Sequence, residues 1–289
     1  MQCGLIYQNP RLMGRALADL YGVEYFVGGD FAGGGHNYFE HEEWQQKVAA
    51  SHRILQWIEE YKPERGILLE VGCAGGSFLM AASERGWKSV GVEVSQYACE
   101  QARQLGLDIF CGELSYAKLP SRFFDVVYLQ DVIEHVPDPG ACLKEIARIL
   151  KTDGILVMFV PTYIETVLNK VWILLSTAKQ SIRGLMGKRS GWYMEKPYHL
   201  YEFMPCTLNE LLTKCGLQVL QLENTASKPA ILLLRGSGLL TACVILPLLW
   251  LFYFCVRAGF CMGDRTTVVA TLGKRQLHGE RRSHRWETQ

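Results

Sequence analysis

A short apolar run that ends in a turn of small residues constrains the fold of this chain more than any other feature. The run covers residues 68–71, the turn covers residues 72–76, and Glu93 ends the next apolar run about twenty residues later. Small residues let the backbone of such a turn approach a ligand closely. An acidic residue at the end of the next strand can accept hydrogen bonds from both hydroxyls of a ribose. The sequence therefore predicts a nucleoside-binding βαβ unit.

The spacing of the small residues separates two classes of nucleoside-binding turn. A dinucleotide-binding turn has glycine at its first, third and sixth positions, and this chain has Gly72, Ala74 and Ser77 there. A nicotinamide dinucleotide and a dehydrogenase function are therefore disfavoured. From these residues alone, a glycine-rich turn in an unrelated α/β protein stays an alternative.

Segments typical of strands and helices alternate along the chain. Apolar residues at helical spacing predict a helix over residues 42–61 that ends before Pro63. Strands are predicted at residues 68–71, 89–94, 108–111, 124–129, 154–160, 218–223 and 266–272. Helices are predicted between them at residues 78–84, 96–105, 139–150 and 207–215. This order predicts an α/β fold, a Rossmann-like, doubly wound sheet of seven strands with helices on both faces.

Four further segments follow the glycine turn in order, FDVV at 124–127, DVIEHVPDP at 131–139, LKTDGIL at 150–156 and PYHL at 197–200. The turn itself has the pattern acidic-x-Gly-x-small-x-Gly. Together these segments resemble the landmarks of class I S-adenosyl-L-methionine (SAM)-dependent methyltransferases of the UbiE/UbiG-like branch. The resemblance implies SAM as the cofactor and an oxygen, ahead of carbon or nitrogen, as the atom that receives the methyl group.

The resemblance also implies which residues bind the cofactor. Glu93 accepts from the ribose hydroxyls, Glu70 lies near the amino group, and the turn with the helix that follows holds the methionine carboxylate. Residues after the third strand hold the adenine, and residues that end the fourth strand line the methyl-transfer site. The complete predicted set is Glu70, Gly72, Cys73, Ala74, Gly76, Glu93, Val94, Ser95, Glu113, Leu114, Gln130 and Asp131.

Two histidines are candidate catalytic residues, because an imidazole with a pKa near neutrality suits removal of a proton from an acceptor hydroxyl. His135 follows the fourth strand, and His199 falls where the acceptor side of the pocket should close. No metal is predicted. As an alternative, Asp131, Glu134 and His135 have a spacing that resembles the metal-binding acids and histidine of ubiquinone-type O-methyltransferases. A purely structural role for His135, in the loop before Pro137, stays open as well.

An uncharged run covers residues 236–256, close to the ~20 residues that span a bilayer. The run lies between the last two predicted strands, which pair in one sheet, so a single crossing would place these strands on opposite sides of a membrane. Pro247 divides the run, and basic residues flank both of its ends, as at cytoplasmic ends of membrane segments. We predict an apolar helical hairpin that enters the cytoplasmic leaflet as a monotopic anchor. A hairpin packed on the protein or in a dimer interface is the alternative.

These patterns predict a domain organisation and a set of partners. The net charge of +1 provides no global field that would attract nucleic acid. The expected partners are a small amphiphilic, lipid-linked or sugar-linked methyl acceptor and the cytoplasmic side of a membrane. A methyltransferase for soluble substrates and a non-catalytic SAM-binding scaffold are the rival functions. The predicted parts are a helical cap segment at residues 1–62, a SAM-binding core at 63–229, the hairpin at 230–263, the last core strand at 264–274 and a basic tail at 275–289.

Overall fold

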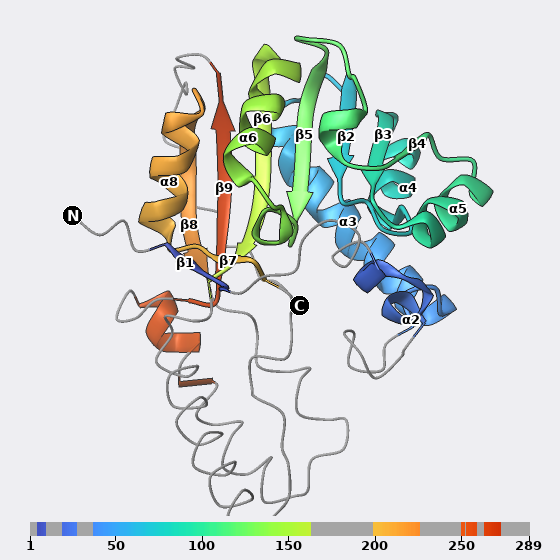
Figure 1. The fold of residues 1–289 in the computed structure, drawn as a ribbon, viewed down its shortest axis with the longest axis horizontal. Helices are drawn as coiled ribbons and strands as arrows, with labels where there is room; N and C mark the ends of the chain where they lie inside the picture. The colour runs from blue at the N-terminus through green and yellow to red at the C-terminus, as the bar shows by residue number, and fades with distance from the viewer. Residues whose placement is uncertain are drawn as a thin grey trace, which may run out of the picture.

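A seven-stranded sheet forms the centre of the protein in the computed structural model (Figure 1). The structure describes residues 5–9, 19–27, 37–162, 199–225, 250–251, 253–258 and 263–272. The strand order is β4-β3-β2-β5-β6-β9-β8. The strands are β2 (Ile67–Val71), β3 (Lys88–Glu93), β4 (Ile109–Cys111), β5 (Phe124–Gln130), β6 (Leu150–Pro161), β8 (Gln218–Thr225) and β9 (Arg265–Thr271).

The sheet is parallel from β4 to β6, and β9 is the one antiparallel strand among the seven. β9 lies between β6 and β8. The last described strand is therefore inserted beside β6, which is the fifth of these seven strands along the chain. Both β3 and β5 flank β2, which places a reversal of strand order at β2. In open α/β sheets, ligands bind outside the carboxyl ends of the strands at such a reversal. The mainly parallel, Rossmann-like sheet predicted from the sequence is confirmed.

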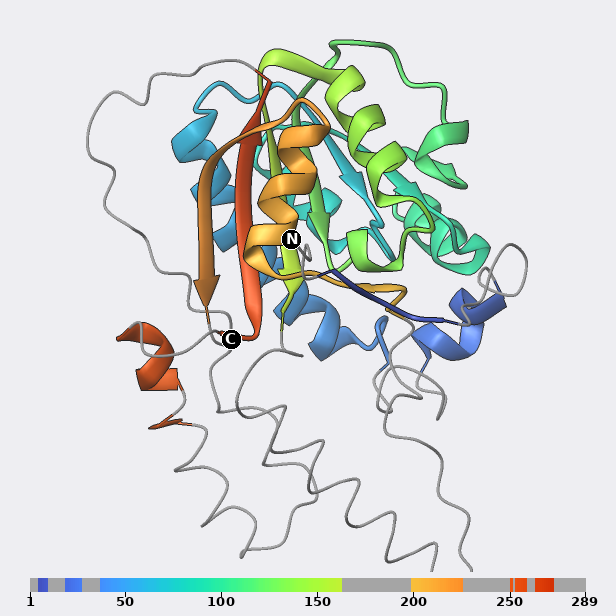
Figure 2. The ribbon, with the colours of Figure 1, turned by 60° about the vertical axis from the view of Figure 1, so that its left-hand side comes forward.

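Helices cover both faces of the sheet, because alternate residues of each buried strand point to opposite sides. One core cluster joins strand residues such as Leu69 and Val127 to α6 (Pro139–Ile149) and α8 (Pro205–Lys214). The other joins their neighbours, such as Leu68 and Val126, to the helices of the opposite face. These are α3 (His41–Tyr61), α4 (Ser77–Glu84) and α5 (Gln96–Gln104). Figure 2 shows α6 and α8 in front of the sheet and α3 behind it.

Local signals explain where several helices begin. The side chain of Asp138 accepts a hydrogen bond from the backbone N–H of Ala141, and Pro139 occupies the first turn of α6. The Ser95 side chain caps α5 in the same way. The predicted bounds of these two helices agree with the structure to within about two residues. The agreement is expected because the signals that start and end a helix lie in residues close together in the sequence.

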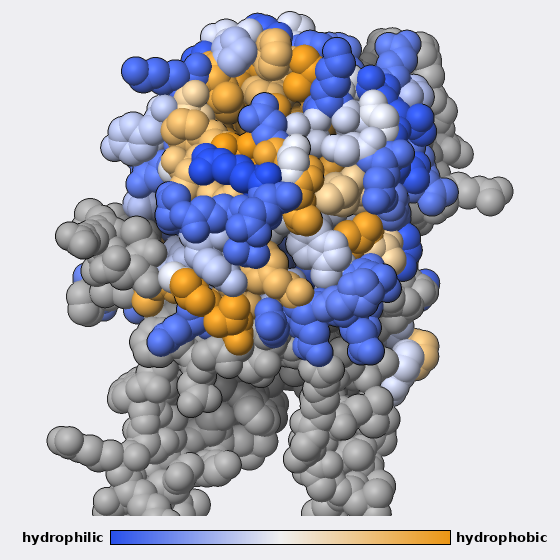
Figure 3. All heavy atoms as spheres, turned by 90° about the vertical axis from the view of Figure 1, so that its right-hand side faces the viewer, coloured by the Kyte–Doolittle hydropathy of each residue, from blue (hydrophilic) through white to orange (hydrophobic). Residues whose placement is uncertain are grey.

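Short N-terminal elements lie at the carboxyl edge of the sheet. β1 (Ile6–Tyr7) pairs with β7 (Tyr201–Glu202) in a two-stranded antiparallel sheet that the sequence analysis did not predict. The turn η1 (Asp19–Tyr21) and α2 (Val23–Phe26) follow. The predicted helical cap thus contains one long helix, α3, and these short elements among the described residues. Hydrophilic side chains dominate the face at the β4 edge of the sheet, with apolar side chains in separate patches (Figure 3).

The predicted apolar hairpin at residues 230–263 is not supported, and most of it lies outside the described residues. Its described part is helical at residues 250–251 and 253–257, where Trp250, Leu251 and Phe254 are exposed. Among the helices that the structure describes, none is both long and apolar enough to cross a membrane. The pairing of β8 with β9 nevertheless shows that this segment connects two neighbouring strands of one sheet.

Candidate functional site

A cavity of about 1320 Å³ opens at the carboxyl edge of the sheet. It is bounded by the turn after β2, the ends of β3 and β4, the turn after β5, and one face of α3. Gly76 and Ser95 lie outside the lining, at the starts of α4 and α5. The other predicted cofactor residues all line it, namely Glu70, Gly72, Cys73, Ala74, Glu93, Val94, Glu113, Leu114, Gln130 and Asp131.

The turn after β2 adopts left-handed backbone conformations that require small residues. Gly72 has a φ of 72°, and Ala74 has a φ of 47°. A Cβ atom on Gly72 would lie 2.4 Å from Cγ2 of Val132, so a side chain there would collide with the turn after β5. Gly76 is the N-cap residue of α4, and no side chain caps the first N–H groups of this helix. The first N–H groups of α4 therefore suit a carboxylate such as that of SAM.

Glu93 connects the glycine turn to the start of α5. Its Oε2 accepts a hydrogen bond of 2.8 Å from the backbone N–H of Ala74, and its Oε1 accepts one of 2.8 Å from the N–H of Ser95. Burial raises the pKa of Glu93, and the backbone N–H groups that it binds oppose this rise. Each carboxylate oxygen keeps a second lone pair, so Glu93 can also accept from the hydroxyls of a ribose.

Glu70 is a buried carboxylate, and no cation of the described residues pairs with it. Its Oε2 has no hydrogen-bond partner among the described residues, and burial together with the charge of Glu93 raises its pKa well above the usual range. An acid in this state fits a ligand group that brings positive charge and N–H donors. The ammonium group of SAM has this chemistry, so Glu70, Glu93 and the glycine turn together fit the cofactor.

The raised pKa of Glu70 predicts a pH-dependent stability of the cofactor-free protein. The folded protein holds a proton that the unfolded chain releases above about pH 4.3, so this group's contribution is fully present below that pH and is lost as the pH rises toward the folded pKa. We expect the unfolding free energy of Glu70→Gln to fall less than that of the wild type as the pH rises above about 4.3.

Chemical denaturation at several pH values measures this difference. Glu64→Gln, which removes an exposed carboxylate next to the same strand, is the matched control and should follow the wild type. S-adenosylhomocysteine should reduce the difference, because its ammonium group would stabilise the ionised form of Glu70. Identical pH slopes for the wild type and Glu70→Gln would contradict this account of Glu70.

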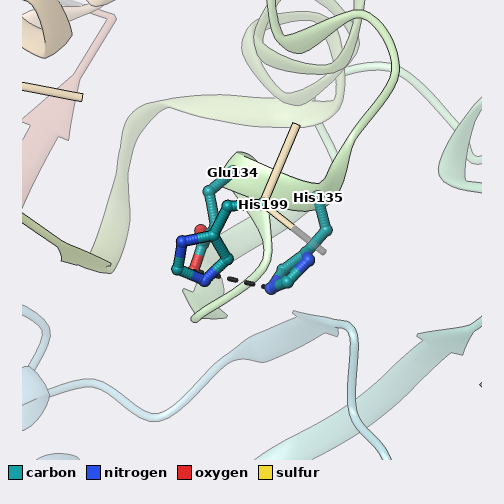
Figure 4. A group of neighbouring side chains, drawn as sticks. All are labelled: Glu134, His135 and His199. Carbon is teal, nitrogen blue, oxygen red and sulfur yellow. Dashed lines mark ion pairs between the residues drawn. The ribbon is translucent and has the colours of Figure 1, made fainter. Parts of the chain in front are cut away.

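Two histidines and a glutamate lie close together beside the cavity (Figure 4). Glu134 and His135 belong to the short 3-10 turn η3 (Ile133–His135), and His199 lies next to them. Oε1 of Glu134 lies 3.8 Å from Nε2 of His135 and 4.0 Å from Nε2 of His199. Nδ1 of His199 lies 2.9 Å from Oε1 of Glu202. Burial and the charge of Asp131 raise the pKa of Glu134 well above its usual range. His135 is among the residues that line the cavity, and His199 is not.

The composition of this cluster differs from the predicted metal alternative. That alternative combined Asp131, Glu134 and His135, but the structure places His199 with Glu134 and His135, with one ligand atom of each within 4.8 Å of the others. The carboxylate of Asp131 instead pairs with Arg265. Asp131 has a φ of 53°, a strained backbone conformation for a residue with a side chain.

An aromatic wall from the N-terminal segment was not predicted from the sequence. Tyr21, Tyr25 and Tyr38 line the cavity, and the ring of Tyr21 contacts that of His135 edge-on at 6.3 Å. The Ser95 hydroxyl donates a hydrogen bond of 2.6 Å to the backbone carbonyl of Tyr21, which fixes this wall to α5. No motif marks these tyrosines, and their frequency in residues 21–38 is the one signal that could have found them.

Comparison with known proteins agrees with this site. A family described as a methyltransferase domain matches residues 69–158, which contain the glycine turn, Glu93 and His135. The ubiquinone biosynthesis O-methyltransferase of Idiomarina loihiensis is 33% identical over 129 residues, which make up 42% of this chain and 51% of that protein. This chain thus spans about half the length of the curated relatives that it matches.

Solved structures share the fold. A SAM-dependent methyltransferase from Archaeoglobus fulgidus is 18% identical, with a TM-score of 0.52 over 81% of this chain and 99% of that one. The [4+2]-cyclase SpnF is 20% identical, with a TM-score of 0.53 over 91% of this chain and 97% of that one. At these identities the likeness concerns the fold alone, and the name of the second protein shows that this fold also carries a different reaction.

Proposed function

We propose that this chain, which contains a class I SAM-dependent methyltransferase domain, transfers a methyl group from SAM to an oxygen atom of a small acceptor. The observation that carries the proposal is the pair of buried carboxylates, Glu70 and Glu93, that face one cavity beside the glycine turn. The name of the Idiomarina loihiensis relative supports oxygen as the methylated atom.

The residues of the chain bind and orient the reactants. Bound SAM supplies a methyl group that its sulfonium already activates, so positioning accounts for most of the catalysis that the protein has to add. Glu93 would hold the ribose, Glu70 the ammonium group, and the N–H groups of α4 the carboxylate. His135 lines the same cavity and would accept the proton of an acceptor hydroxyl.

Calorimetry with S-adenosylhomocysteine, followed by transfer assays with radiolabelled SAM, tests the function. We expect binding together with methyl transfer to a hydroxylated acceptor in a panel of phenols, sugars and lipid-linked sugars. Binding without transfer to any acceptor would favour a SAM-binding scaffold. Binding of NAD in place of S-adenosylhomocysteine would favour a dehydrogenase.

We also propose that the enzyme works at the cytoplasmic face of a membrane on an amphiphilic acceptor. The uncharged run at residues 236–256 motivates this proposal, and its described part exposes Trp250, Leu251 and Phe254. Exposed apolar and aromatic side chains of this kind favour contact with lipid.

Flotation with vesicles that contain an anionic phospholipid measures this association. We expect the wild type to float with the vesicles and the variant Trp250→Ser/Phe254→Ser to float less, because each change removes apolar area from the contact. Light scattering measures the alternative, an apolar dimer interface. A protein that does not float, but forms a dimer that the same two changes dissociate, would contradict the membrane proposal.

A further inference from the structure

The basic side chains around the cavity come from two elements. Six carboxylates line the part formed by the carboxyl ends of β2 and β3, by the loops that follow β4 and β5, and by α6, and no lysine or arginine of these described segments lines the cavity. These carboxylates are Glu70, Glu93, Glu113, Asp131, Asp138 and Glu145. The lysine and arginines of the described lining come from α3 and β9 and are Lys47, Arg53 and Arg265, with Glu60 of α3 beside them.

The part of the cavity beside α3 is also apolar. Ile54 and Trp57 of α3 face Phe159 at the end of β6, and the rings of Trp57 and Phe159 lie 6.2 Å apart between centroids. The ring of Tyr128 continues this surface at 6.0 Å from Phe159. We call this region the α3 lobe, defined by Lys47, Arg53, Ile54, Trp57, Phe159 and Arg265.

Arg265 is held in place at the edge of the α3 lobe. Its Nη1 and Nη2 lie 3.3 Å from the two carboxylate oxygens of Asp131, and its side chain is 22% exposed. These distances exceed the 2.7–2.9 Å of a tight charge-assisted pair. A guanidinium has five N–H donors in a rigid plane, so pairing with one carboxylate leaves donors for a second anion. Asp131 thus orients Arg265 without saturating it.

We infer that Arg265 binds a negatively charged group, a carboxylate or a phosphate, of a methyl acceptor whose apolar body packs against Ile54, Trp57 and Phe159. This inference rests on the proposed methyltransferase function and names the class of its acceptor. The acidic part of the cavity suits the cationic cofactor, and the guanidinium of Arg265 in the α3 lobe suits an acceptor of the opposite charge. Such complementarity favours the correct partner in each part of the cavity.

Three probes test the inference by their effect on tryptophan fluorescence in the presence of saturating S-adenosylhomocysteine, because Trp57 lies in the α3 lobe. Dodecyl phosphate, below its micelle concentration, has the anion and the apolar body, dodecanol has only the apolar body, and methyl phosphate has only the anion. We expect dodecyl phosphate to bind at least about tenfold more tightly than either of the others.

Substitutions of Arg265 identify the group that binds the anion. Arg265→Gln should weaken binding of dodecyl phosphate about tenfold to 100-fold and leave dodecanol unchanged, while Arg265→Lys should have a smaller effect. Lys214→Gln, which removes an exposed charge from α8 outside the cavity, is the control and should bind as the wild type does. An unchanged affinity for S-adenosylhomocysteine shows that each variant is folded.

Equal affinities for dodecyl phosphate and dodecanol, or an Arg265→Gln variant that binds dodecyl phosphate as the wild type does, would overturn the anion site. If methyl phosphate binds as tightly as dodecyl phosphate, the proposed packing of an apolar body in the α3 lobe would be wrong. The ligand of Arg265 would then be a soluble anion. Failure of the proposed function looks different, because the wild type would then not bind S-adenosylhomocysteine or would transfer no methyl group to any acceptor.

Discussion

Replacing Glu93 with alanine is expected to weaken the binding of S-adenosylhomocysteine about 100-fold or more. The substitution removes the carboxylate that would accept from the two ribose hydroxyls, and hydrogen bonds to charged groups contribute about 1.5–3 kcal/mol each. It also leaves the N–H groups of Ala74 and Ser95 without their acceptor, which loosens the glycine turn. Isothermal titration calorimetry measures the affinity directly.

Two further variants separate the loss of ligand contacts from a loss of fold. Glu93→Gln keeps one carbonyl oxygen and should fall between the wild type and Glu93→Ala. Glu100→Ala removes an exposed carboxylate from the nearby helix α5 and should bind as the wild type does. Thermal unfolding of each variant shows whether the fold persists. An affinity of folded Glu93→Ala within about threefold of the wild type would contradict the role of Glu93 in binding the ribose.

Replacing His135 with alanine is expected to lower kcat about 10²- to 10⁴-fold and to leave the affinity for S-adenosylhomocysteine unchanged. His135 lines the cavity and contacts Tyr21, Glu134 and His199, so a base at this position is both accessible to an acceptor and held in orientation. Single-turnover assays with radiolabelled SAM measure the chemical step. His52→Ala, which removes a surface imidazole paired with Glu84, is the matched control.

A chelator distinguishes a base from a metal ligand at His135. A general base predicts turnover that resists chelation and that His135→Gln lowers about as much as His135→Ala does. A metal held by Glu134, His135 and His199 predicts that chelation abolishes turnover, that a divalent cation restores it, and that His199→Ala lowers turnover as much as His135→Ala. Turnover of His135→Ala within about threefold of the wild type would contradict both roles.

The central elements of this fold follow from short stretches of sequence. Apolar runs predict β5 and β6, and a helix is predicted between them at residues 139–150, where the structure has α6, because these signals depend on residues close together in the chain. The carboxyl edge of the sheet, with Glu70, Glu93 and the glycine turn, follows in turn from the parallel order of the strands. The cofactor side of the cavity is therefore largely a local property of the sequence.

The acceptor side was decided only by the tertiary structure. Asp131 meets Arg265 because β9 is inserted between β6 and β8. His199 meets Glu134 because the backbone N–H of Leu200 donates a hydrogen bond of 2.9 Å to the carbonyl of Glu134. Each contact joins segments far apart in the chain, so no local spacing predicts it. The sequence by itself determined the parallel sheet and the two acids, Glu70 and Glu93, at its carboxyl edge, since strand periodicity is local. The insertion of β9 decided which groups line the cavity beside α3, since it depends on the packing of the whole sheet.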